Sequence, residues 1–273
     1  TVQAAIDSAA SKSGYQMVFV SPGVYNENIT LPSYVGLYSF AKDPVKIGTD
    51  DPLNIHTLDF QSGGNIFLKN IDLRNDSVVA NHTAGSTGSA NLEIIESKLG
   101  SLIFNGLGSI DNVEIESSTI RDYIELHSTN YKINSTEIQG ESSSVSLLID
   151  DTGSENTDSN GYSSIGYIKN SDLAFSLSTQ GAIYTLFHST NNEGAVSIDG
   201  TDAKLVYDVN SIGVNSSINL LNGAVAQRDS QAYYLGFDNT TTPLTSNNVQ
   251  DAIEEILGLK VKGVLFVAKN GSD

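Results

Sequence analysis

The sequence lacks cysteine and tryptophan, contains one methionine, and has only 14 basic residues against 32 acidic ones in a chain of 273 residues. The absence of cysteine excludes disulfide bonds, cysteine-ligated zinc and thiol catalysis. The formal net charge of −18 argues against polyanionic partners such as nucleic acid or an anionic membrane surface. The longest apolar runs, at residues 18–20 and 264–268, are too short to span a bilayer. We therefore expect no nucleic-acid partner, no membrane partner and no cofactor.

The polar part of the chain consists mainly of serine, asparagine, threonine and glycine rather than lysine and glutamate. With valine, isoleucine and leucine between them, these residues favour short strands joined by many turns over helices. A disordered chain can be rich in serine and asparagine too, but it lacks the regular apolar spacing described next.

Five segments align without gaps, at residues 65–73, 91–99, 112–120, 130–138 and 165–173. The fourth position is always leucine or isoleucine, namely Leu68, Ile94, Ile115, Ile133 and Ile168. The ninth position follows the same rule with Leu73, Leu99, Ile120, Ile138 and Leu173. The sixth and seventh positions are mostly small and polar, so each segment is expected to form a strand, a corner and a second strand.

These segments begin 18 to 35 residues apart, and a unit of this size buries its apolar face only by stacking on its neighbours. The Leu-x-x-Leu-x-Leu pattern of leucine-rich repeats is absent. We therefore predict an all-β fold, a right-handed single-stranded parallel β-helix (solenoid). A polar, glycine-bearing stretch at about 150–163 is predicted to be a loop insertion, and a weaker sixth copy of the repeat lies at 204–212.

The beginning of the chain has helical apolar spacing and is predicted to form an N-terminal capping helix at about residues 1–12. The stretches TVQAAIDSAA (1–10) and VFVSPGVYNENITLPSYVGLYS (18–39) resemble the opening of pectin lyase-like β-helix proteins. In that family a capping helix precedes a first turn with a Pro-Gly-x-Tyr sequence. The resemblance covers about the first forty residues and implies the fold, since enzymes and non-enzymatic virion proteins share this opening.

The end of the chain is predicted to contain a short helix at 244–257, with one apolar stripe and an N-cap at Ser246 or Asn247. Residues 241–256 (TTPLTSNNVQDAIEEI) resemble a segment of bacteriophage tail-fibre proteins. Residues 263–273 (GVLFVAKNGSD) resemble the strand that precedes the capping helix of a pectin lyase-like domain. We therefore predict a β-helix domain over 1–238 and a C-terminal helical linker over 239–273 that leads into a further module.

Catalysis on a polysaccharide requires two carboxylates that face one sugar. The candidate pairs are Asp122 with Glu125, and Asp150 with Asp151. The motifs of polygalacturonases and pectinesterases are absent, and the acids near Arg121 are equally well explained as an exposed ion pair. We expect no catalytic role; an active protein would be a polysaccharide hydrolase or lyase.

Binding residues are also sparse. Tyr162 and Tyr167 are candidates for glycan binding, because aromatic faces with asparagine and serine nearby suit sugar rings. Asp158, in the predicted loop, is a candidate oxygen ligand for Ca²⁺, although a bare acidic loop explains it equally well. The four histidines show no zinc-binding spacing, so we expect no metal site.

The resemblance of the end segments to phage fibre modules, together with the missing catalytic constellation, implies a structural virion protein of a bacteriophage, of tail-fibre, tailspike-like or baseplate-associated type. Its expected partners are other virion proteins and host-surface polysaccharide, and its expected location is the virion surface. A homotrimer is compatible with the C-terminal helix. The alternatives are a tailspike polysaccharide depolymerase and a bacterial surface adhesin module.

Overall fold

The computed structural model describes residues 1–40, 45–49, 51, 53–60, 63–82, 88–107, 111–140, 145–151, 164–174, 177–191, 195–208, 211 and 218–229. The chain divides into two compact units, Thr1–Gln227 and Arg228–Asp273, and the first holds the solenoid. The predicted helix at 244–257, the linker over 239–273 and the predicted boundary after residue 238 lie outside the described residues, as does most of the predicted loop at 150–163.

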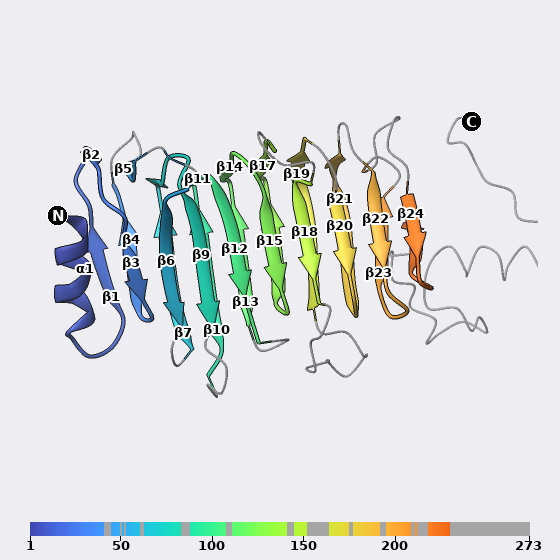
Figure 1. The fold of residues 1–273 in the computed structure, drawn as a ribbon, viewed down its shortest axis with the longest axis horizontal. Helices are drawn as coiled ribbons and strands as arrows, with labels where there is room; N and C mark the ends of the chain where they lie inside the picture. The colour runs from blue at the N-terminus through green and yellow to red at the C-terminus, as the bar shows by residue number, and fades with distance from the viewer. Residues whose placement is uncertain are drawn as a thin grey trace, which may run out of the picture. The chain divides into compact units, whose positions relative to one another are not determined.

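The helix α1 (Val2–Ala10) caps the N-terminal end of the solenoid, as the apolar spacing predicts (Figure 1). Val2 and Ile6 are buried in the same core as the first strands. The Glu27 carboxylate accepts hydrogen bonds from the backbone amides of Val2 at 2.7 Å and Gln3 at 3.1 Å. A negative side chain therefore lies at the positive end of the helix dipole and stabilises the cap.

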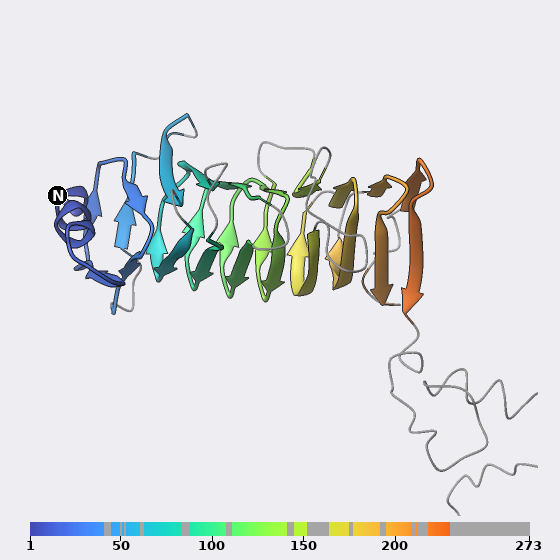
Figure 2. The same ribbon diagram turned by 90° about the horizontal axis from the view of Figure 1, so that it is seen from below.

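Three faces of parallel strands follow α1, and each complete turn adds one strand to every face (Figures 1 and 2). The first face contains β1 (Gln16–Phe19), β4 (Val35–Tyr38), β7 (Gly64–Lys69), β10 (Ala90–Ile95), β13 (Asn112–Glu116), β16 (Asn130–Asn134), β19 (Ser164–Leu173), β21 (Ile183–Asn191), β23 (Lys204–Asp208) and β25 (Val225–Asp229). The second face contains β2 (Val24–Tyr25), β5 (Val45–Ile47), β8 (Ile71–Asp72), β11 (Lys98–Leu99), β14 (Thr119–Ile120), β17 (Glu137–Ile138) and the ends of β19 and β21. The third face contains β3 (Thr30–Pro32), β6 (Ile55–Phe60), β9 (Ser77–His82), β12 (Ser101–Asn105), β15 (Ile124–His127), β18 (Leu147–Asp150), β20 (Leu177–Gln180), β22 (Val196–Asp199) and β24 (Ile218–Leu221). The prediction of an all-β parallel solenoid is confirmed.

The repeat positions become columns of side chains inside the solenoid. The fourth-position residues pair in register from turn to turn and are fully buried; they are Leu68, Ile94, Ile115, Ile133 and Ile168. The ninth-position residues are buried in the same core. Stacking these columns supplies the apolar burial that no single turn achieves, which confirms the repeat alignment.

The interval of 39 residues between the starts of the fifth segment and the weaker copy at 204–212 predicts two turns, and the structure confirms them. Strand β21 lies between the fifth segment and the weaker copy at 204–212, which accounts for the long interval between them. Leu205 is fully buried and Tyr207 packs partly buried against the core, as the weaker copy predicts. Ile212 lies outside the described residues.

The corner between the first and second faces is built by the sixth and seventh repeat positions. The sixth position adopts a left-handed backbone conformation in every segment, at Asn70, Glu96, Ser117, Ser135 and Asn170. The seventh position is Ile71 in the first segment and a buried serine or threonine in the other four. The hydroxyls of Ser97, Ser118 and Ser171 each accept a backbone N–H from the preceding turn; the Ser118 hydroxyl, for example, accepts from the Ser97 amide at 3.1 Å. The same hydroxyl donates to the Glu116 carbonyl at 2.8 Å. These small polar residues therefore satisfy buried backbone groups at each corner.

The fifth segment departs from the apolar pattern because it has glycine at the second position, Gly166. Gly166 pairs in register with Tyr131 of the turn before and Thr185 of the turn after. The Tyr131 ring is buried over Gly166, and its hydroxyl hydrogen-bonds to the Thr185 hydroxyl. The missing side chain thus makes room for a ring that spans two turns.

Candidate functional site

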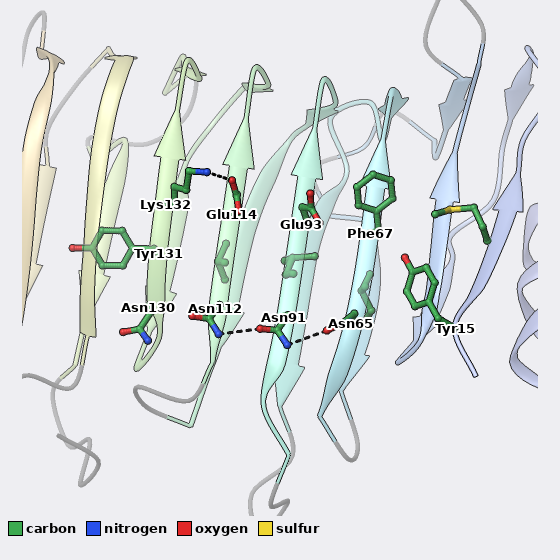
Figure 3. Close-up of a pocket in the computed structure, with 14 residues that line it drawn as sticks. Tyr15, Asn65, Phe67, Asn91, Glu93, Asn112, Glu114, Asn130, Tyr131 and Lys132 are labelled. Carbon is green, nitrogen blue, oxygen red and sulfur yellow. Dashed lines mark hydrogen bonds and ion pairs between the residues drawn. The ribbon is translucent and has the colours of Figure 1, made fainter. Parts of the chain in front are cut away.

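The outer surface of the first face contains a groove with a volume of about 630 Å³ (Figure 3). Its lining comes from the segment before β1 and from β1, β7, β10, β13 and β16; the lining residues are Tyr15, Met17, Asn65, Ile66, Phe67, Asn91, Leu92, Glu93, Asn112, Val113, Glu114, Asn130, Tyr131 and Lys132. The groove crosses six successive strands of the first face, counting β4, and so extends about 24 Å at the usual spacing between paired strands. A groove in this direction suits an extended ligand.

An asparagine ladder runs along one side of the groove (Figure 3). It consists of the first repeat positions Asn65, Asn91, Asn112 and Asn130, which pair in register. The Asn91 side-chain amide donates to the Asn65 side-chain oxygen at 2.9 Å, and the Asn112 amide donates to the Asn91 oxygen at the same distance. Each primary amide has two N–H groups and a carbonyl oxygen, so the ladder combines mutual support with hydrogen-bonding capacity toward a ligand.

Aromatic rings close the end of the groove near α1. Tyr15 is 41% exposed, and its hydroxyl lies only 2.4 Å from where a side-chain Cβ at Gly36 would be. Gly36 pairs with Met17 on one side and Phe67 on the other, so the glycine leaves a hollow that holds the tyrosine. Burial raises the pKa of the Tyr15 hydroxyl and Glu93 raises it further, so this hydroxyl remains a hydrogen-bond donor.

The third repeat positions form the floor of the groove, where Glu93 lies between Phe67 and Glu114 in adjacent strands (Figure 3). Lys132 on the next strand forms an ion pair with Glu114, which raises the pKa of Lys132. Burial raises the pKa of the Glu93 carboxyl, and the charges of Glu114 and Glu116 raise it further. Two neighbouring carboxyl groups therefore differ in environment, one paired with a cation and one crowded by anions.

A second aromatic group lies on the same face at the ends of β1 and β4. Phe19 and Phe40 stack with their ring centroids 5.1 Å apart, and Tyr38 contacts both rings edge to face. Phe19 is 60% exposed and Phe40 is 75% exposed. With Pro22 they line a hollow of about 350 Å³. Exposed rings in such number at one place are characteristic of ligand-binding surfaces.

The structure separates the carboxylates of the predicted pair Asp150 and Asp151. Asp150 is partly exposed on the third face, where its carboxylate lies 3.6 Å from His127 Nδ1. Asp151 is buried, and its carboxylate hydrogen-bonds with Ser128 and Ser164. The two acids therefore do not share a groove.

The second predicted pair is also divided between environments. Glu125 joins the same third-face cluster, since its carboxylate lies 2.8 Å from His127 Nε2. Asp122 lies before β15, and its neighbour Arg121 forms an ion pair with Asp72 at 2.9 Å rather than with Asp122 or Glu125. The structure thus brings Glu125 together with Asp150, a combination that the sequence does not indicate.

The remaining predicted site residues are not grouped. Tyr167 lies partly exposed on β19, in register with Lys132, and is not one of the residues that line the groove. Tyr162 and Asp158 lie outside the described residues. Within the described part of the chain, no three histidine, aspartate or glutamate side chains are arranged to hold a metal ion.

Two histidines are buried beside aspartates, which their scattered positions in the sequence do not suggest. His56 Nε2 lies 3.2 Å from Asp76 Oδ2, and His82 Nδ1 lies 2.8 Å from Asp111 Oδ2. All four side chains are fully buried. Burial lowers the pKa of His56 despite the opposing effect of Asp76. These pairs lie away from the groove lining and stabilise strand ends.

Asp151 makes a testable contribution to the pH dependence of stability. Burial raises its pKa from 3.8 to about 6, so the folded state binds a proton more tightly than the unfolded state. The free energy of unfolding should therefore decrease as the pH rises from about 4 to about 6. We expect Asp151→Asn to remove this part of the dependence and to be more stable than the wild type above pH 6. Urea denaturation of both proteins across this pH range measures the free energy of unfolding. Parallel profiles for the two proteins would contradict a raised pKa of Asp151.

None of the helices in the described residues is long and apolar enough to cross a membrane. Comparison of the chain with family models, curated proteins and solved structures gives no match. The resemblance to pectin lyase-like proteins therefore rests on the residues at the chain ends and on the parallel solenoid.

The groove residues were missed in the sequence because they are far apart along the chain. The available signal is the third position of the aligned repeats, which reads Phe67, Glu93, Glu114, Lys132 and Tyr167. Reading this position as a column places these side chains in one outward row. Tyr15 lies outside the repeats, and no repeat pattern indicates its position in the groove.

Proposed function

We propose that this chain is a structural β-solenoid module of a bacteriophage virion, of tail-fibre or tailspike-like type, and that its groove contacts a host-surface polysaccharide. The virion assignment is supported by the resemblance of residues 241–256 to a segment of bacteriophage tail-fibre proteins. Polysaccharide contact is supported by one structural observation, the long groove that combines exposed aromatic rings with an asparagine ladder.

The chemistry of the groove suits sugar rings in particular. A pyranose has apolar C–H faces that pack on aromatic rings, and Tyr15 and Phe67 provide such rings at one end. Its hydroxyl groups both donate and accept hydrogen bonds, as do the side-chain amides of the ladder. The asparagine ladder repeats at the strand spacing, so a polymer of similar units makes similar hydrogen bonds on successive strands.

Binding to a panel of bacterial cell-surface polysaccharides tests the proposal. We expect the wild-type chain to retain at least one polysaccharide, and Phe67→Ala to weaken that binding at least tenfold, since loss of an aromatic anchor costs about 2 kcal/mol. Ile55→Ala is the matched control, because Ile55 is an exposed apolar residue on the third face. The absence of binding to the whole panel, or equal losses in both variants, would refute polysaccharide contact through the groove.

A polysaccharide hydrolase is a second candidate, and the adjacent carboxyl groups of Glu93 and Glu114 favour it. They project from register-paired residues on neighbouring strands, and the usual strand spacing of about 4.8 Å is close to the carboxyl separation in retaining glycosidases. Glu93, with its raised pKa, would be the general acid, and Glu114, paired with Lys132, the nucleophile. Shortening of a bound polysaccharide that Glu93→Gln abolishes would favour this role over a purely structural one.

A further inference from the structure

The charge distribution of the groove limits the kind of polysaccharide that it holds. Two carboxylates line the middle of the groove, Glu93 on β10 and Glu114 on β13, and Glu116 follows on the same strand as Glu114. Lys132 is the lysine among the lining residues, and it is already paired with Glu114. Lys69 on β7 acts on Glu93 from outside the lining and is paired with Glu96. The middle of the groove therefore carries negative charge that these lysines do not balance.

The surroundings of Glu93 reflect this negative charge. Glu114 and Glu116 raise the pKa of Glu93 in addition to the effect of its burial, and the opposing effects of Lys132 and Lys69 are smaller. A ligand carboxylate placed over the groove floor would meet the same repulsion, since like charges a few ångströms apart near a protein surface repel strongly. It would also lose hydration on entering a partly enclosed groove.

The aromatic end of the groove also disfavours anionic ligands. The faces of the Tyr15 and Phe67 rings carry partial negative charge, which favours C–H groups or cations and disfavours anions. The asparagine ladder is uncharged and offers an acidic sugar no counter-charge. Two independent parts of the lining therefore discriminate against anionic ligands and leave the hydrogen bonding and stacking of a neutral sugar unaffected.

We propose that the groove selects uncharged polysaccharides and rejects those that contain uronic acids or other anionic groups. This inference rests on the proposed function, because it specifies the chemical class of the glycan that the groove contacts.

The test uses one polysaccharide in two charge states. The polysaccharide retained in the binding panel is compared with the same material after oxidation of its primary hydroxyl groups to carboxylates. We expect the native form to be neutral and the oxidised form to bind the wild-type chain at least tenfold more weakly at low salt, with partial recovery at high salt because salt screens the repulsion.

Variants locate the source of the selectivity. Glu93→Gln with Glu114→Gln removes two negative charges from the groove floor and should restore binding of the oxidised form about tenfold, with little change for the native form. Glu137→Gln is the matched control, because it removes an exposed negative charge from the second face. Retention of only acidic polysaccharides, or equal gains in the groove and control variants, would overturn the selectivity. If no polysaccharide binds at all, the proposed function itself fails.

Discussion

Gly166→Ala should destabilise the solenoid by about 3 kcal/mol, at the upper end of the range for overpacking a core. An added Cβ would lie 2.3 Å from the backbone oxygen of Tyr131 and 2.4 and 2.5 Å from two carbons of its ring. The backbone oxygen cannot move without disturbing the ladder between β16 and β19. The ring is held from its other end by the Thr185 hydroxyl.

Urea denaturation of the full chain measures the loss, and two further variants identify its cause. Gly23→Ala is the control, since a Cβ there has its nearest contact at 3.4 Å, an ordinary packing distance. The double variant Gly166→Ala with Tyr131→Ala lacks the ring. Its loss of stability should be about 1 kcal/mol smaller than the sum of the losses of the two single variants, which is the coupling expected of residues in contact. A Gly166→Ala protein as stable as the wild type would show that the ring does not pack over this position.

The second large effect is expected at Asp111. Asp111→Ala should lower the free energy of unfolding by about 3 kcal/mol or more, because it removes one partner of a buried, hydrogen-bonded pair. The Asp111 carboxylate accepts backbone N–H bonds from Ala90 at 2.8 Å and Leu107 at 2.6 Å. It also contacts His82 Nδ1 at 2.8 Å. This one side chain therefore connects the end of β9, the start of β10 and the chain after β12.

Two comparisons isolate that contribution. Asp111→Asn keeps an acceptor oxygen of the same shape and should lose clearly less stability than Asp111→Ala. Asp172→Ala removes an exposed aspartate and should change the stability by no more than about 0.5 kcal/mol. Thermal and urea unfolding measure the stability of all three variants. If Asp111→Ala matched Asp172→Ala, the buried network would have no stabilising role.

The repeat alignment predicted the solenoid and its core because each turn contacts chiefly the turns beside it. In such a fold a position in the repeat becomes a column in space, so Ile115 necessarily lies between Ile94 and Ile133. The outward columns follow by the same rule. The groove floor was nevertheless missed, since paired acids were sought close together in the sequence, whereas Glu93 and Glu114 are one turn apart.

The predicted acid pairs show the limit of reasoning from adjacent residues. Asp150 and Asp151 are neighbours in the chain, but alternation along a strand directs successive side chains to opposite sides. One of them meets His127 on the third face and the other is buried against serine hydroxyls. Neighbours across turns, rather than along the chain, define the sites on a solenoid.

The amino-acid sequence alone was sufficient for the strand columns, the polar corners and the capping helix, because all three depend on periodicity or on local capping. Three-dimensional packing was needed for the features that the repeat pattern does not specify. Tyr15 reaches the groove through the space left at Gly36, Tyr131 crosses the turn at Gly166, and the buried histidine–aspartate pairs join turns at strand ends. These contacts depend on the shapes of side chains and on loops of unequal length, neither of which a repeating pattern specifies.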